Sequence, residues 1–126
     1  MVRISPNNAA VVTDPRQVGQ VVSVLLDNAV THYEGRRDGL RIAVDGGEAA
    51  DGTLYLDVAD NGPGIPEEAR ARIFEPFFST RHHGTGLGLY IARELSEACN
   101  VRLEHIPPPG GGCRFRLSFP DPRLLA

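Results

Sequence analysis

Residues 74–98 read FEPFFSTRHHGTGLGLYIARELSEA, in which a phenylalanine-rich turn is joined to a periodic helical segment through three alternate glycines, Gly84, Gly86 and Gly88. Glycine is costly in ordered structure because it loses more backbone freedom on folding than any other residue. Bare N–H groups beside a helix N-terminus bind phosphate through hydrogen bonds and the helix dipole. The stretch therefore predicts a phosphate-binding loop, although its spacing is not that of a P-loop. A flexible hinge before a helix is the alternative interpretation.

The chain around this stretch predicts an alternation of helices and strands. Asp14-Pro15 marks a helix start, and apolar residues at helical spacing continue it to residues 33–35. That apolar face consists of Val18, Val21, Val22, Leu25, Leu26 and Ala29. Alternating residues predict a hairpin of strands at 40–44 and 53–58, joined by a polar loop over 45–52.

The second half of the chain continues this order of elements. Pro66 opens a short helix, and residues 87–98 form a long one with Leu87, Ile91, Leu95 and Ala98 on one face. Strands at 101–105 and 113–119 flank a turn at 107–112. This order suits an α+β domain in which helices stack on one face of a sheet.

Composition excludes several classes of protein. The 126 residues carry a net charge of −3, and no basic stripe is visible, which argues against a nucleic-acid partner. All 13 basic residues are arginine, so the sites of P-loop proteins and eukaryotic-type kinases, which rest on a lysine, are excluded. Apolar runs are too short for a membrane span, and no signal-peptide core is found. Cys99 and Cys113 are expected to be reduced thiols of a cytosolic protein.

Two polar motifs precede the glycine loop. Asn28 lies on the polar side of the first helix, and an amide oxygen is a ligand suited to Mg²⁺. Asp60 directly follows a strand, with Gly62 and Gly64 just beyond it. A carboxylate accepts a hydrogen bond from the exocyclic amine of adenine, whereas guanine presents a carbonyl there. Taken alone, Asn28 is also compatible with a solvated side chain, and residues 60–65 with a tight turn.

The three motifs in this order resemble the ATP-binding domain of bacterial two-component sensor histidine kinases, in the group shared with gyrase, Hsp90 and mismatch-repair ATPases. Residues 25–29 are similar to the N box, 60–65 to the G1 box, 74–78 to the F box and 84–89 to the G2 box. The resemblance covers residues 14–120 and is strongest to nitrogen-regulatory and pilus-regulatory sensor kinases. It implies the Bergerat fold, a two-layer α/β sandwich with a mixed, mostly antiparallel sheet of about five strands and about three helices on one face.

The resemblance implies a role for each matching residue. Asn28 would be the Mg²⁺ ligand, Asp60 would read adenine, and Phe74, Phe77 and Phe78 would form the hinge of a short ATP lid over residues 79–83. Arg81 would supply the cation at the γ-phosphate, and it is the second catalytic candidate beside Asn28. The nucleotide-binding positions would be Asn28, Asp60, Gly62, Gly64, Ile65, Phe74, Thr80, Arg81, Gly84, Thr85, Gly86, Leu87 and Gly88.

The chain departs from the family pattern at several positions. Val24 stands where histidine kinases usually have a second Asn and where the ATPase branch has a general-base Glu, which counts against hydrolysis. Thr31 replaces a frequent Lys, and Cys113 stands where a Ser or Thr often supports the adenine-reading acid. None of the histidines is followed by an acid, as a phosphoacceptor histidine would be. Residues 1–126 are therefore expected to be the catalytic fragment of a longer kinase.

The resemblance implies that the domain holds Mg·ATP and donates the γ-phosphoryl to a histidine of a separate dimerisation domain, for onward transfer to a response regulator, with pilus genes as one target. The fragment alone would turn ATP over negligibly. It would be cytoplasmic, without membrane or nucleic-acid contact, although its parent could be anchored in the inner membrane. The alternatives are an ATP-hydrolysing clamp, an anti-sigma Ser/Thr kinase, which also lacks its usual Glu here, and a nucleotide-binding module that has lost transfer.

Overall fold

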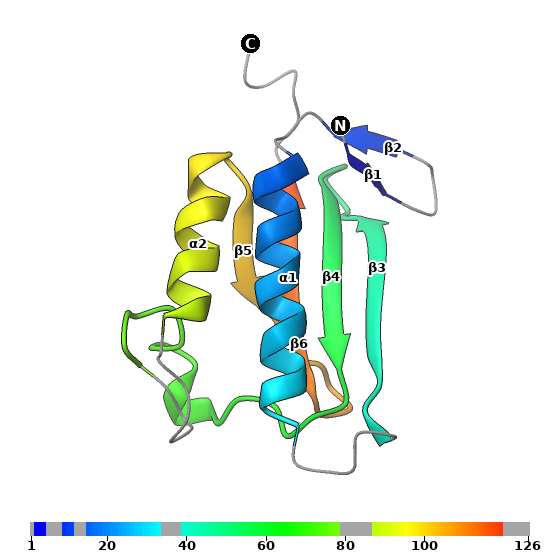
Figure 1. Ribbon diagram of the computed structural model, residues 1–126. Coiled ribbons are helices and arrows are strands. Elements are labelled where there is room, and N and C mark those ends of the chain that lie inside the picture. Colours follow the sequence, from blue (N-terminus) through cyan, green and yellow to red (C-terminus); the bar gives the residue numbers. More distant parts are fainter. Residues whose placement is uncertain (1, 5–8, 12–14, 34–38, 79–86, 120–126) are drawn as a thin grey trace.

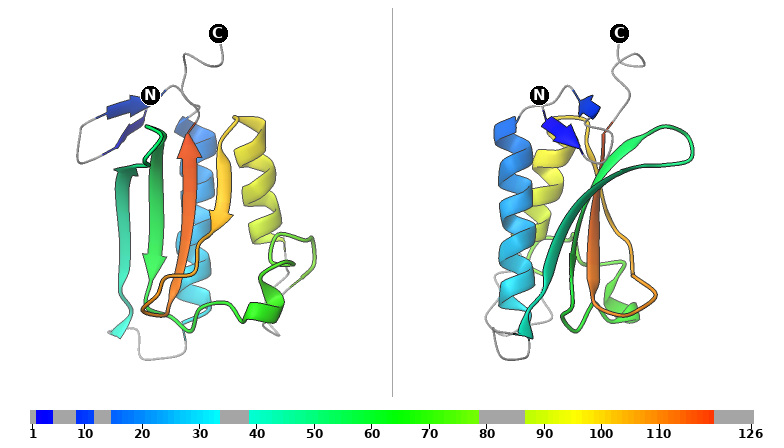
Figure 2. Two further views of the ribbon diagram at one scale, coloured as in Figure 1. Left: turned by 180° about the vertical axis from the view of Figure 1, so that it is seen from behind. Right: turned by 90° about the vertical axis from the view of Figure 1, so that its right-hand side faces the viewer.

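A four-stranded sheet carries two α-helices on one of its faces (Figures 1 and 2). The computed structural model describes residues 2–4, 9–11, 15–33, 39–78 and 87–119. The strand order is β3-β4-β6-β5, and every neighbouring pair is antiparallel. The strands are β3 (Ile42–Glu48), β4 (Leu54–Asp60), β5 (Arg102–His105) and β6 (Cys113–Phe119). The helices are α1 (Pro15–Thr31) and α2 (Gly88–Ala98), with a 3-10 turn, η2 (Glu67–Ala69), between β4 and α2.

This architecture confirms the α+β class and the single helical layer, but the numbers of strands and helices differ from those expected. The main sheet has four strands rather than about five, and its described ladders are all antiparallel. A separate two-stranded ribbon, β1 (Val2–Ile4) with β2 (Ala9–Val11), was not predicted, and β1 contacts both β3 and β4. The short helix predicted at Pro66 is a single 3-10 turn. Within the described residues the helical layer therefore consists of two α-helices.

The core lies between this helical layer and the sheet. Along β6, residues alternate between buried and half-buried, and the buried ones include Phe115, Leu117 and Phe119. From α1, the side chains of Val21 and Leu25 are almost completely buried against them. The apolar face predicted for α1 is therefore confirmed, because its periodicity of 3.6 residues matches a single buried surface.

The apolar face predicted for α2 was only partly right, because Leu95 packs against the core but two of its other members do not. Ile91 is 43% exposed and Ala98 is exposed, whereas Ala92 and Ser96 are the buried positions. Both side chains are small, and the Ser96 hydroxyl donates a hydrogen bond to the Ala92 carbonyl at 2.8 Å, so its polar group is satisfied within the helix. These small residues let α2 approach its neighbours closely, and the partly buried Leu89 and Leu95 pack against the same core.

The loop predicted over residues 45–52 was too long, because β3 continues to Glu48 opposite Leu54. The turn is confined to residues 49–53, where the Ala49 amide donates to the Thr53 carbonyl at 2.8 Å. Gly46 and Gly47 resemble a loop in sequence but are part of an edge strand. A side chain at Gly47 would collide with the Tyr55 ring on β4, so the ring covers the glycine instead.

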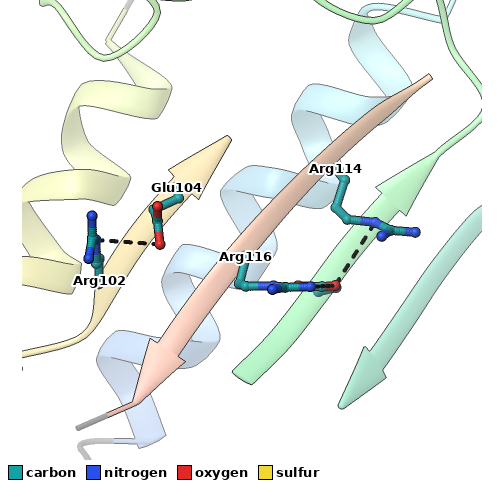
Figure 3. A network of polar contacts seen from close by, with 5 residues as sticks. Arg102, Glu104, Arg114 and Arg116 are labelled. Carbon is teal, nitrogen blue, oxygen red and sulfur yellow. Dashed lines mark hydrogen bonds and ion pairs between the residues drawn. The ribbon is translucent and has the colours of Figure 1, made fainter. Parts of the chain in front are cut away.

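The sheet face opposite the helices carries a network of charged residues (Figure 3). Asp57 is only 8% exposed, and Arg116 donates to both of its carboxylate oxygens, at 2.7 and 2.9 Å. The Arg116 guanidinium also stacks on the Tyr55 ring, 3.7 Å from its centroid. Asp57 raises the pKa of Arg116 through this hydrogen bond. The Arg102–Glu104 pair, by contrast, is solvent-exposed at 3.4 Å.

The buried and exposed pairs in this network make contrasting predictions. We expect Arg116→Met to lower the free energy of unfolding by about 1.5–3 kcal/mol, because it keeps most of the stem but removes charged hydrogen bonds from a buried carboxylate. Arg102→Met is expected to change it by roughly 0–1 kcal/mol, as is usual for exposed ion pairs. Urea denaturation of both variants measures the difference. Equal effects would show that Asp57 does not depend on Arg116.

Neither cysteine forms a disulfide, as predicted: Cys113 is buried and Cys99 is half-buried. Both helices of the described part of the chain fall short of the length and apolarity that a membrane crossing requires.

Candidate functional site

The end of β4 places the Asp60 carboxylate at the edge of the sheet. Asp60 is half-buried, and its Oδ1 accepts a hydrogen bond from the Gly62 amide at 2.8 Å. The backbone of Cys113, its partner in the β4–β6 ladder, also favours the ionised carboxylate. Burial raises the pKa of Asp60, and the two amides and the neighbouring His32 oppose this shift. The result is an oriented carboxylate whose remaining lone pairs can accept a ligand hydrogen.

Gly62 and Gly64, both predicted as pocket glycines, follow Asp60 closely. A Cβ at Gly62 would stand 3.0 Å from the Asp60 carboxylate oxygen. Gly64 has a φ of +76°, and a Cβ there would approach the Gly112 carbonyl to 2.7 Å. Gly64 is therefore required by its backbone conformation and by close backbone packing, whereas Gly62 is only tightly packed against a side chain. The loop after β4 lies directly against the turn before β6.

Asn28 lies near the C-terminal end of α1, which reaches the same end of the molecule as the end of β4 (Figure 1). The residue is half-buried. His32, one turn later, donates from Nδ1 to the Asn28 carbonyl at 2.9 Å, and its charge acts on Asp60. His32 is thus bonded to the backbone of the residue predicted to bind metal and interacts electrostatically with the residue predicted to read adenine.

The start of α2 packs on the same part of α1. A Cβ at Gly88 would stand 3.6 Å from Val24, one helical turn before Asn28. Leu87 is half-buried and directly precedes the helix. The other predicted loop residues, Thr80, Arg81, Gly84, Thr85 and Gly86, lie outside the described residues, as do His82 and His83. The described part of the loop therefore enters α2 next to the segment that carries Asn28.

The F-box aromatics differ in their surroundings. The Phe74 ring packs edge-on against Phe115, with centroids 6.3 Å apart, and Arg93 lies over it. Phe78 is half-buried beneath Arg72, and Phe77 is 77% exposed with a φ of +67°. Phe74 thus has the ordinary core contact that an aromatic hinge residue is also expected to have. Ile65 likewise packs against the core, and its carbonyl accepts from Arg70 at 3.2 Å.

Sequence reasoning missed residues that shape this site. Gly112 was treated only as part of a turn, yet it touches both Asp60 and Gly64. Tyr33 lies close to Gly62 and even closer to Gly39, where a Cβ would stand 2.7 Å from its hydroxyl. The glycine run at 110–112 was a visible signal, but no local pattern reveals which member contacts Asp60.

The arrangement combines an oriented acceptor, close backbone and a helix start at one end of the domain. Burial and the charge of Asp60 raise the pKa of the Cys113 thiol to about 12, so Cys113 stays a neutral neighbour of the carboxylate. No group of three or more His, Cys, Asp or Glu residues that could hold a metal occurs within the described ranges. An ion at Asn28 would therefore take most of its ligands from a bound phosphate and water, which is the usual pattern for Mg²⁺.

Comparison with known proteins gives a consistent set of relatives. Residues 13–123 match the family model for histidine kinase-, DNA gyrase B- and HSP90-like ATPases. The sensor protein kinase PilS of Pseudomonas aeruginosa is 40% identical over 119 residues, which cover 90% of this chain and 22% of PilS. The nitrogen regulation protein NtrY of Azorhizobium caulinodans is 37% identical over 112 residues, covering 84% of this chain and 14% of NtrY.

Solved structures agree with this grouping. The catalytic domain of histidine kinase ThkA superimposes with a TM-score of 0.75 at 28% identity, covering 94% of this chain and 75% of that one. Full-length ShkA in complex with AMPPNP gives a TM-score of 0.68 at 33% identity, covering 82% of this chain and 21% of ShkA. The chain thus spans about a fifth of PilS, and less of NtrY.

Proposed function

The chain belongs to the histidine kinase-, DNA gyrase B- and HSP90-like ATPase family, and on this basis we propose that it is the ATP-binding catalytic domain of a sensor histidine kinase. It binds Mg·ATP and donates the γ-phosphoryl to a histidine of a dimerisation domain elsewhere in a longer kinase. The phosphoryl group then passes to a response regulator, and the 40% identity to PilS supports pilus genes as a target.

The single observation that carries this proposal is the convergence of three elements at one end of the fold. The charge of His32 acts on the Asp60 carboxylate, His32 bonds to the Asn28 backbone carbonyl, and α2 begins against the preceding turn of α1. Asp60 accepts the adenine amino group, and Gly62 and Gly64 leave room for the flat base. The amides at the start of α2 face the phosphates.

The chain's own residues supply positioning more than covalent chemistry, which is what phosphoryl transfer requires. A Mg²⁺ ion, when bound, would neutralise phosphate charge during transfer. The amide oxygen of Asn28 suits it as a neutral ligand, and the half-buried position of Asn28 at the end of α1 is compatible with contact to a bound phosphate. Arg81, which lies outside the described residues, is proposed as the cation at the γ-phosphate.

Val24 favours transfer over hydrolysis. Its side chain packs at the start of α2, where a Cβ at Gly88 would stand 3.6 Å away. Valine cannot accept a proton from water, so the chain has no general base at this position. An ATP-hydrolysing clamp is therefore the weaker candidate, and the fragment alone is expected to turn ATP over negligibly.

Phosphoryl transfer can be tested directly. The chain is incubated with Mg²⁺ and γ-labelled ATP, with and without a separately prepared dimerisation domain from its parent kinase. We expect acid-labile label on a histidine of that domain and negligible phosphate release by the chain alone. Rapid phosphate release without the second domain would instead identify a hydrolase. Tight ATP binding with no label on the histidine would identify a nucleotide-binding module without transfer activity.

A further inference from the structure

The turn before β6 contacts Asp60 more closely than any side chain would allow. Gly112 has a φ of +81°, and a Cβ there would collide with the Asp60 carbonyl oxygen and stand 3.4 Å from the Asn61 Cα. Both neighbours are backbone atoms, which cannot move away as a flexible side chain can. The Gly112 carbonyl also lies where a Cβ at Gly64 would have to be, at 2.7 Å. Gly112 is therefore in contact with both ends of the loop that follows β4.

The residue after Gly112 holds the carboxylate itself. Asp60 faces Cys113 in the β4–β6 ladder, and the Cys113 amide lowers the pKa of the Asp60 carboxyl, as does the Gly62 amide, which donates to Oδ1 at 2.8 Å. The ψ angle of Gly112 sets the direction of the Cys113 N–H, because the two share a peptide plane. Gly112 precedes this amide in the left-handed region, with a φ of +81°, which glycine adopts without steric cost.

We propose that Gly112 is a positioning residue for adenine recognition, which orients the Asp60 carboxylate through the Cys113 amide and through its packing against Gly64. This inference rests on the proposed function, because it gives Gly112 a role in the same base pocket. Gly112 acts through Asp60 and does not itself need to touch the nucleotide. It determines affinity for the base and leaves the phosphate-binding residues of α1 and α2 unaffected.

Gly111 offers a matched control. Its φ is +87°, so alanine there meets the same intrinsic backbone strain, but its Cβ would have no atom within 4 Å. We expect Gly112→Ala to weaken binding of Mg·ATP and of adenosine about tenfold, with Mg·tripolyphosphate binding unchanged, as measured by calorimetry. Gly111→Ala should leave all three affinities within about twofold. Equal losses in the two variants, or equal losses for adenosine and tripolyphosphate, would overturn the proposal.

A second measurement uses the unmodified chain and no nucleotide. In an acid titration followed by NMR, the Cys113 and Gly62 amide resonances should shift with one shared midpoint, that of the Asp60 carboxyl, while the Gly111 amide does not follow it. A Cys113 amide that fails to follow Asp60 overturns the inference even if the chain binds ATP. If the expected titration is seen but the chain does not bind ATP, the proposed function fails while the contact between Gly112 and Asp60 stands.

Discussion

Replacing Asp60 with asparagine is expected to weaken binding of Mg·ATP by about tenfold to a hundredfold, because a hydrogen bond to a charged group contributes about 1.5–3 kcal/mol. The asparagine oxygen still accepts from the Gly62 amide. The second carboxylate oxygen, however, is replaced by an NH₂ group, so the amino group of adenine meets a donor where it had an acceptor. Guanine presents a carbonyl at this position, so the preference for ATP over GTP should narrow. Calorimetric titration of the native chain and the variant with both nucleotides measures both effects. Unchanged ATP affinity would remove the assignment of Asp60 to the base pocket.

The same substitution should not destabilise the fold at neutral pH. Burial raises the pKa of Asp60, so the folded chain holds this proton more tightly than the unfolded chain does. Stability therefore falls as pH rises from the ordinary pKa of an aspartate to the raised one, and the ionised carboxylate is a net cost above it. Removing the charge with asparagine should keep or raise the free energy of unfolding. A loss of ATP binding in this variant is then a loss of recognition.

Asp57, on the same strand, provides a control in which stability is expected to change and ATP affinity is not. Its carboxylate is held by Arg116 on the sheet face away from the helices. Asp57→Asn should lower the free energy of unfolding while leaving ATP affinity unchanged. If both aspartate variants instead lose binding in proportion to their stability, the nucleotide data would report unfolding and not contact with the base.

The sequence predicts those parts of the fold in which local pattern and tertiary packing agree. In α1 the helical period matches one buried face, and in β6 strict alternation matches a sheet with one covered side. The prediction failed in β3, where Gly46 and Gly47 resemble a loop but pair with Leu56 and Tyr55. Whether such a segment forms a strand depends on its pairing with another strand, and local propensity contains no information about that pairing.

The candidate site divides in the same way. Asp60, Gly62 and Gly64 form a local motif, so their proximity was visible from spacing alone. Residues 110–112 are all glycine, so the sequence does not distinguish them. In the structure, only Gly112 of these three would have atoms within 4 Å of an added Cβ. Which glycine approaches Asp60 depends on the register of β6 against β4, where Asp60 faces Cys113. No one-dimensional pattern contains that register, so the contact could be found only in the structure.

Asn28→Ala is expected to reduce phosphoryl transfer to the dimerisation domain on the order of a hundredfold or more, which is the usual effect of removing one group that stabilises transition-state charge. Adenosine affinity should stay within about twofold, because the base pocket around Asp60 is formed by β4 and the turn before β6. The initial rate of histidine labelling and calorimetry with adenosine measure the two effects separately. The Asp60 variant should show the reverse order, with the larger relative loss in adenosine binding.

The control for Asn28 is its neighbour Asp27, which is exposed on α1 and lies about 100° around the helix. Asp27→Asn removes a negative charge next to the candidate Mg²⁺ ligand without altering the amide of Asn28. If transfer depends on the Asn28 oxygen, Asp27→Asn retains activity within a few-fold, and raising the Mg²⁺ concentration partly restores the Asn28→Ala variant. If the Asp27 variant loses as much transfer as the Asn28 variant, general electrostatics at the end of α1 would explain both, and Asn28 would not be the ligand. The labelling rate over a Mg²⁺ series therefore decides whether the amide oxygen binds the ion.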